Sequence, residues 1–230
     1  MREFHVLQDV RKALRNIADP VKAVAMQAYM KSVMPYHGVP APLVRRICKE
    51  VFAKANLDTA SRWQELVLDL WRNARFREER YAALQLAGDK RARGFQTPRA
   101  MEMYEELIVT GAWWDYVDDI AAHRLGPILK DYPTPLRRKM LAWSKGADMW
   151  QRRSSIICQL LFKEETDLTL LYACIEPSLG SREFFLQKAI GWALRQYAWT
   201  DPAEIKRFVR LNTDRLSPLS QREALKNLIS

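Results

Sequence analysis

Cysteine and histidine are scarce in this 230-residue chain, and their spacing excludes two kinds of site. Cys48, Cys158 and Cys174 are odd in number and far apart, and no two of them form a CxxC pair. This pattern argues against a disulfide framework and favours reduced thiols in the core of a cytoplasmic protein. The three histidines are not spaced as metal ligands or for a catalytic dyad, so we expect no metal ion.

Long apolar runs and the common cofactor and catalytic motifs are also missing. No hydrophobic stretch approaches the ~18–20 residues that a membrane-spanning helix needs, and the start of the chain lacks a signal-peptide pattern. The chain has no Walker loop, no GxGxxG, HExxH or GxSxG motif, and no zinc-finger spacing. We therefore expect a cytoplasmic protein that acts away from membranes and without a cofactor.

Glycine is limited to eight residues and no strand-like alternation persists, whereas helix-start signals recur. In each signal a capping side chain precedes a proline at the first helical position, where the missing N–H costs nothing. These dipeptides are Asp19-Pro20, Thr97-Pro98, Thr134-Pro135, Asp201-Pro202 and Ser217-Pro218. Between them apolar residues recur at helical spacing, as at Leu66, Leu70 and Trp71. The sequence thus predicts an all-α protein.

A weak internal period indicates repeated helix pairs. Thr97-Pro98 and Thr134-Pro135 are 37 residues apart, and Trp114 and Trp150 are 36 residues apart. Both spacings fit the roughly 35–45-residue period of HEAT or armadillo units. We expect about six antiparallel helix pairs stacked into an α-solenoid with a concave basic groove. No linker rich in Gly, Ser or Pro divides the chain, so we expect one domain over residues 1–230.

The charge of the chain is strongly positive and evenly spread. Lys and Arg number 37 against 27 Asp and Glu, giving a net charge of +10, of which each half of the chain carries +5. A distributed excess of this kind suits a long surface that faces a polyanion, with nucleic acid favoured over an acidic membrane.

Residues 113–121 combine a predicted buried face with a separate pair of functional groups. Trp113, Val117 and Ile120 recur at helical spacing and predict the buried face. Trp114 and Asp118 are one turn apart on a different side of the same helix. An indole beside a carboxylate suits a cationic planar ligand. The alternative is that Trp114 packs against a neighbouring helix while Asp118 is solvated.

Two further patterns place tryptophan beside cations. A stripe away from the buried face of the helix around residue 190 comprises Lys188, Trp192, Arg195 and Trp199. Such a stripe suits contact with a phosphate backbone and a sugar or base, although packing at an interface would also explain it. Arg153 follows Trp150 by one turn, so an indole could brace a guanidinium aimed at phosphate. The alternative there is an ordinary surface arginine.

Several segments of the chain together resemble the AlkD family of bacterial DNA glycosylases. They are residues 105–118, 150–153, 183–192 and 218–224, with residues 29–31 and the region of Trp71. The resemblance implies a HEAT-like superhelix that wraps double-stranded DNA. It also implies excision of cationic alkylated purines, such as 3-methyladenine and 7-methylguanine, with the lesion left stacked in the duplex. We expect a monomer that acts as a monofunctional glycosylase of base excision repair, associated with the nucleoid during repair.

Carried over by position, the resemblance implies that Trp114, Asp118 and Trp192 form the catalytic cleft, and that Arg153 holds backbone phosphate. Further DNA contacts are expected from Lys188, Arg195, Arg152 and Tyr29. The residues fit this chemistry, because an alkylated purine is already a cationic leaving group. A carboxylate such as Asp118 can then stabilise the sugar cation and position water.

Two alternatives of another class remain open. One is a non-catalytic DNA-binding solenoid, which needs the cations but not Asp118. The other is a protein-interaction scaffold with a basic groove, which needs no indole–carboxylate pair. Release of free base from methylated DNA distinguishes the enzyme from both.

Overall fold

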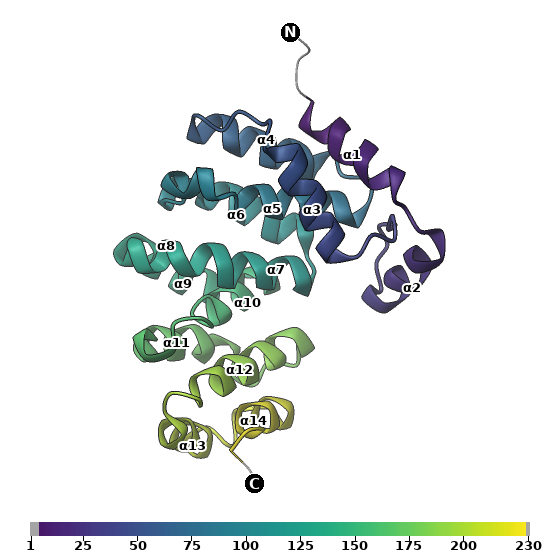
Figure 1. Cartoon of the computed structure of the whole chain (residues 1–230). Helices are drawn as coiled ribbons and strands as arrows, with labels where there is room; N and C mark the ends of the chain where they lie inside the picture. Colours follow the sequence, from purple (N-terminus) through teal and green to yellow (C-terminus); the bar gives the residue numbers. More distant parts are fainter. Residues whose placement is uncertain (1–4, 229–230) are drawn as a thin grey trace. The chain divides into compact units, whose positions relative to one another are not determined.

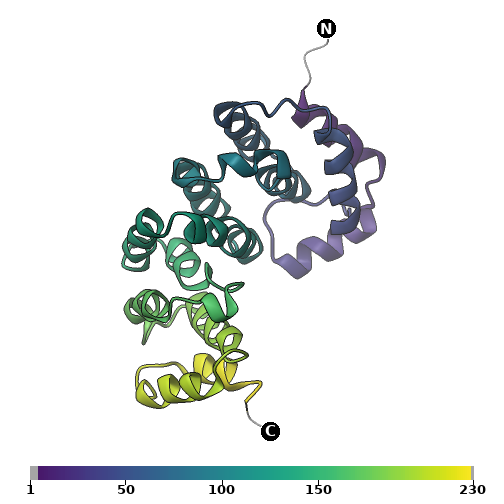
Figure 2. The ribbon, with the colours of Figure 1, turned by 60° about the vertical axis from the view of Figure 1, so that its left-hand side comes forward.

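A computed structural model describes residues 5–228, which contain α-helices and short 3₁₀ and π segments but no β-strand. The all-α class predicted from the sequence is confirmed. The chain forms two compact units, of which the first ends at Phe95 and the second begins at Gln96 (Figures 1 and 2). The single domain expected over residues 1–230 stays a prediction.

The first unit is built on four helices that share a core. Its helices are α1 (Val6–Asn16), α2 (Pro20–Met30), α3 (Ala41–Phe52), α4 (Ala60–Arg72) and α5 (Arg77–Ala87), followed by a 3₁₀ segment (Lys90–Phe95). Helices α1, α3, α4 and α5 pack on one another, and Trp63 and Trp71 of α4 are fully buried. Helix α2 buries only Met30.

The segment between α2 and α3 is fixed by the first turn of α5. The carboxylate of Glu78, itself fully buried, accepts hydrogen bonds of 2.9, 2.9 and 3.0 Å from the backbone N–H groups of residues 37–39. Gly38 has a φ of +81°, and a Cβ there would overlap the carbonyl oxygen of Asp19. Only glycine therefore fits this position.

The second unit is a stack of consecutive helices. They are α6 (Met101–Gly111), α7 (Trp114–Ile120), α8 (Gly126–Asp131), α9 (Pro133–Ser144), α10 (Met149–Ile157), α11 (Leu168–Ile175), α12 (Phe184–Tyr197), α13 (Pro202–Leu211) and α14 (Pro218–Leu225). A π-helical turn, Ala121–Leu125, joins α7 to α8. The helices follow one another in layers along the teal-to-yellow part of Figure 1, as a solenoid requires. The number of pairs and the concave basic groove stay predictions.

Helix α10 packs against several other helices of the second unit. It packs against α7, α9 and α12, and α12 in turn packs closely against α14. Residues far apart in the sequence on α7, α10 and α12 are thereby brought together.

Four of the five proline-marked starts are confirmed. The predicted prolines begin helices α2, α13 and α14 and the 3₁₀ turn before α6. In each case the side chain before the proline accepts a hydrogen bond from a backbone N–H group of the first turn. The fifth is wrong, because α9 begins at Pro133 without a side-chain cap. Pro133 itself supplies the fixed φ of a first helical residue, so the helix starts before Thr134.

The three cysteines are free and buried, as the sequence predicted. Burial raises the pKa of the Cys48 thiol to about 12. The described residues include no cluster of His, Cys, Asp or Glu placed to hold a metal ion. None of the described helices is long and apolar enough to span a membrane.

Candidate active site

Two of the predicted site residues, Asp118 on α7 and Arg153 on α10, form a bidentate ion pair. Arg153 donates from Nε to Asp118 Oδ1 at 2.7 Å and from Nη2 to Oδ2 at 2.8 Å. Only 5% of the Arg153 side chain and 14% of the Asp118 side chain are exposed. Two parallel bonds fix the plane of the carboxylate as well as its position.

Arg153 also reaches a third helix. Its Nη1 donates to the backbone carbonyl of Phe185, in the first turn of α12, at 2.6 Å. Each guanidinium nitrogen therefore has a protein acceptor, and one side chain links α7, α10 and α12. The sequence did not predict the contact with Asp118, and the expected phosphate contact of Arg153 stays a prediction.

The environment of Asp118 opposes its ionisation. Burial raises the pKa of the Asp118 carboxyl above its usual value, and the charge of Asp115 acts in the same direction. The hydrogen bonds and positive charge of Arg153 oppose the rise. A carboxyl whose pKa is shifted by burial and by a specific charged partner is common at functional sites.

Three aromatic rings at the same helices pack together. The ring centroid of Phe185 lies 5.5 Å from that of Trp113 and 5.0 Å from that of Trp150, and the two indoles are 6.4 Å apart. Trp113 is the N-cap of α7 rather than part of its helical face, which is a correction to the sequence prediction. Val117 and Ile120 are fully buried, as predicted.

Trp114 and Trp192 both keep part of their side chains exposed. Trp114 is the first residue of α7, one turn before Asp118, and Trp192 lies on α12. Because α10 packs against both helices, the two indoles belong to neighbouring layers of one unit. Their assignment with Asp118 to a catalytic cleft stays a prediction.

Lys188 and Arg195 are joined by a carboxylate that the sequence argument did not use. Lys188 Nζ lies 2.9 Å from Glu223 Oε1, and Arg195 Nη1 donates to Glu223 Oε2. Their DNA-binding roles stay predictions. The predicted stripe is shorter than expected, because α12 ends at Tyr197 and Trp199 lies beyond it, 72% exposed.

The two remaining predicted DNA contacts are Arg152 on α10 and Tyr29 on α2. Arg152 Nη2 donates at 3.0 Å to both the Pro177 carbonyl and Ser178 Oγ. Tyr29, on α2 of the first unit, is 80% exposed. The roles of both in DNA binding stay predictions.

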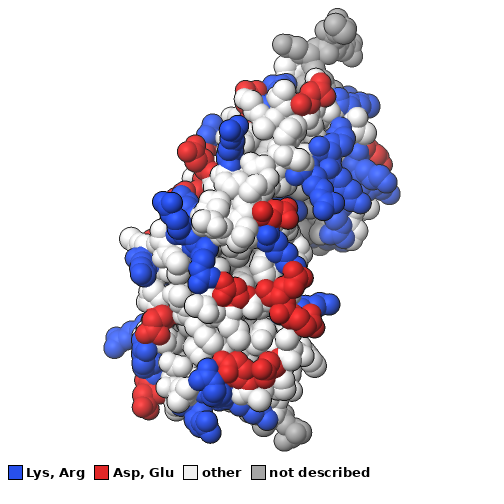
Figure 3. Space-filling model, turned by 90° about the vertical axis from the view of Figure 1, so that its left-hand side faces the viewer, with Lys and Arg blue, Asp and Glu red and all other residues white. Residues whose placement is uncertain are grey.

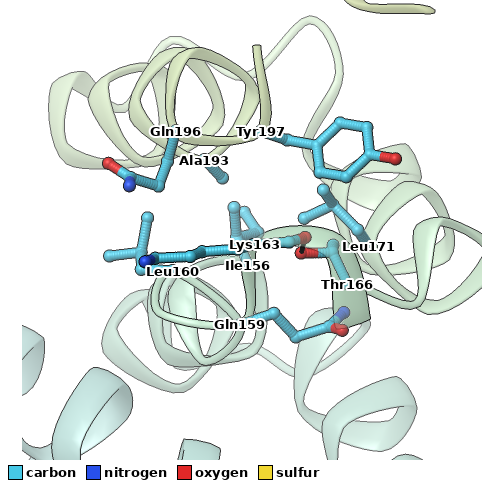
Figure 4. A pocket seen from close by; sticks show the side chains of 9 residues that line it. All are labelled: Ile156, Gln159, Leu160, Lys163, Thr166, Leu171, Ala193, Gln196 and Tyr197. Carbon is cyan, nitrogen blue, oxygen red and sulfur yellow. Dashed lines mark hydrogen bonds between the residues drawn. The ribbon is translucent and has the colours of Figure 1, made fainter. Parts of the chain in front are cut away.

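A small cavity lies between α10, α11 and α12 (Figure 4). Its volume of about 10 Å³ has room for roughly one water molecule. Aliphatic side chains such as Ile156 and Leu160 line it together with polar ones such as Gln159, and no predicted site residue does. The cavity is therefore too small to hold a base.

Basic and acidic side chains are interspersed over most of the molecular face in Figure 3. Positive charge on that face is therefore broken by negative charge.

Sequence reasoning missed Phe185 and Glu223 as partners of site residues. Glu223 lies in the segment 218–224 that carries part of the resemblance, but its partners are 35 and 28 residues away. One signal was present, because Gly191 interrupts a strong helical pattern, and a glycine there indicates close packing.

Comparisons with known proteins agree on one family. The model of the family described as "DNA alkylation repair enzyme" matches residues 10–228. The chain is also similar to the solved structure of a predicted DNA alkylation repair enzyme from Enterococcus faecalis, with a TM-score of 0.76 and 29% identity. That match covers 93% of this chain and 97% of the other. No curated protein matches the sequence.

Proposed function

Because this chain belongs to the DNA alkylation repair enzyme family, we propose that it is a monofunctional DNA glycosylase. It hydrolyses the N-glycosidic bond of cationic alkylated purines, 3-methyladenine and 7-methylguanine, in double-stranded DNA. It acts as a monomer and needs neither a metal ion nor a cofactor.

The observation that carries the proposal is the oriented carboxylate of Asp118. Arg153 holds both carboxylate oxygens, and the Trp114 indole lies one helical turn away on α7. A non-catalytic DNA binder needs no carboxylate to contact phosphate, and a mostly buried negative charge costs free energy to desolvate.

The reaction needs little from the protein beyond electrostatic stabilisation. An alkylated purine leaves as a neutral base, so no general acid has to protonate it. Positive charge develops on the sugar as the bond breaks, and a fixed carboxylate stabilises that charge without reorganising. The partly exposed indoles of Trp114 and Trp192 offer π-faces to the same cation. Asp118 then orients the attacking water.

The test is single-turnover release of 7-methylguanine from methylated duplex DNA by Asp118→Asn at saturating enzyme. The variant keeps the size of the side chain but loses its charge. We expect a rate loss on the order of 10²-fold, the scale found for one preorganised electrostatic group. Duplex binding should hold or improve.

Asp119→Asn is the matched control, because it removes the same charge from the next residue of α7, which faces Arg124 at 3.6 Å. It should release base at close to the wild-type rate. Equal rates for wild type and Asp118→Asn would remove Asp118 from the mechanism. A wild-type protein that binds duplex DNA but releases no base would instead be the non-catalytic binder.

A further inference from the structure

One carboxylate, that of Glu223 on α14, lies between the two cations that flank Trp192 on α12. Lys188 and Arg195 each bind a different oxygen of Glu223, and Lys188 does so at 2.9 Å. The exposed side-chain fractions are 38% for Lys188, 22% for Arg195 and 14% for Glu223. The cations are thus reachable from solvent, whereas the carboxylate is mostly covered.

Helix packing, rather than charge, places Glu223 there. A Cβ at Gly191 would lie 2.5 Å from Glu223 Cβ and 3.0 Å from the Ser220 carbonyl oxygen, so α14 uses the space left by the missing side chain. Ser220 Oγ also donates to the Gln187 carbonyl at 2.9 Å. The backbone of α14 is therefore held on α12 by contacts that do not involve the carboxylate.

The arrangement halves the positive charge of this stripe. Two cations and one carboxylate leave a local charge of +1. The hydrogen bond from Lys188, followed by that from Arg195, lowers the pKa of the Glu223 carboxyl, so the carboxylate is ionised at neutral pH. A phosphate would bind the same two donors through its oxygens, as the carboxylate does.

We propose that Glu223 is an internal counter-ion that competes with DNA phosphate for Lys188 and Arg195. This inference rests on the proposed function, in which Trp192 of α12 faces the sugar cation of the bound duplex. When DNA binds at this stripe, a phosphate replaces the Glu223 carboxylate as the partner of the two cations. Because the carboxylate contacts are lost in this exchange, attachment to undamaged DNA is weaker than it would be without Glu223. Glu223 sets the affinity without contacting the reacting atoms.

The experiment compares Glu223→Gln with Glu204→Gln by fluorescence anisotropy on an undamaged duplex over a range of salt. Glu204, on α13, is a close match, because Arg207 holds it and its side chain is 16% exposed. Removing one negative charge about 5 Å from a phosphate should tighten binding roughly 4-fold to 10-fold at low salt. The log–log salt slope should become steeper by about 0.9. Glu204→Gln should change affinity less than about twofold.

Three further measurements test whether Glu223 acts through Lys188 and Arg195. Glu223→Asp, whose carboxylate is one methylene shorter, should bind with an affinity between those of wild type and Glu223→Gln. In a chain carrying Lys188→Gln and Arg195→Gln, Glu223→Gln should gain less than twofold. Melting temperatures of all variants check that folding is retained, because the Gly191 and Ser220 contacts remain.

The outcomes separate this inference from the proposed function. Weaker binding by Glu223→Gln would show that the carboxylate positions the cations, and a change equal to that of Glu204→Gln would show that it does not compete. Either result overturns the inference even if the wild type releases alkylated bases. Conversely, a wild type that binds duplex DNA without releasing base refutes the glycosylase, while the affinity comparison still decides the role of Glu223.

Discussion

Replacing Arg153 with methionine should destabilise the second unit far more than an ordinary arginine substitution. The change leaves the Asp118 carboxylate mostly buried with neither of its two guanidinium hydrogen bonds, and it also removes the donor to the Phe185 carbonyl. Breaking a buried pair by removing one partner costs about 3–5 kcal/mol. At roughly 2–4 °C per kcal/mol, the melting temperature should fall by about 6–20 °C.

The stability lost in Arg153→Met should depend on pH, and the pKa of Asp118 gives the direction of that dependence. Burial raises the pKa of Asp118, so the folded state binds a proton more tightly than the unfolded state does. Stability then falls as the pH rises from about 3.9, the unfolded value, through the raised folded value. Without Arg153 the folded pKa rises further and this window widens. The variant should therefore recover part of its stability as the pH is lowered towards 5.

The assay is thermal and urea unfolding of Arg153→Met beside Arg137→Met. Arg137 pairs with Asp167, but 36% and 44% of their side chains are exposed, so this control should cost at most about 1 kcal/mol. Adding Asp118→Asn to Arg153→Met should restore stability, because the unpaired charge is gone. Equal losses for the two methionine variants, or no restoration in the double variant, would refute the reasoning.

Two other predictions concern packing and chemistry. Gly191→Ala gains about 1 kcal/mol of helix propensity but places a Cβ 2.5 Å from Glu223 Cβ, which overpacks α12 against α14. We therefore expect urea unfolding to show a net loss of about 1–2 kcal/mol in the free energy of unfolding. A more stable variant would contradict the close packing. EDTA should leave the rate of base release from methylated duplex DNA unchanged, and strand scission should appear only after alkali or heat. If EDTA abolished activity and a divalent ion restored it, the reaction would not be metal-independent.

The parts of the fold that local chemistry controls could be predicted from the sequence. Asp19, Asp201 and Ser217 each cap a helix that begins at the following proline, because the interaction spans only two or three residues. The same rule failed at Thr134, where an earlier proline offered an equivalent start. Helical spacing also placed Trp114 and Asp118 one turn apart on α7.

The pairings within the site could not be predicted in this way. Asp118 and Arg153 are 35 residues apart, and so are Lys188 and Glu223. Such pairs depend on which helix packs against which, and helical periodicity carries no information about that. The sequence showed Arg153 beside Trp150 on one helix, whereas its carboxylate partner comes from another.

The single guanidinium that joins α7, α10 and α12 also bears on how this region opens and closes. In a stack of helices each layer contacts only its neighbours, so individual layers can fray. Here, detaching any of the three helices would strand a buried charge or an unsatisfied carbonyl. Local fluctuations of these helices are therefore cooperative, and the carboxylate of Asp118 is held by Arg153 in its bidentate geometry only when all three helices have docked.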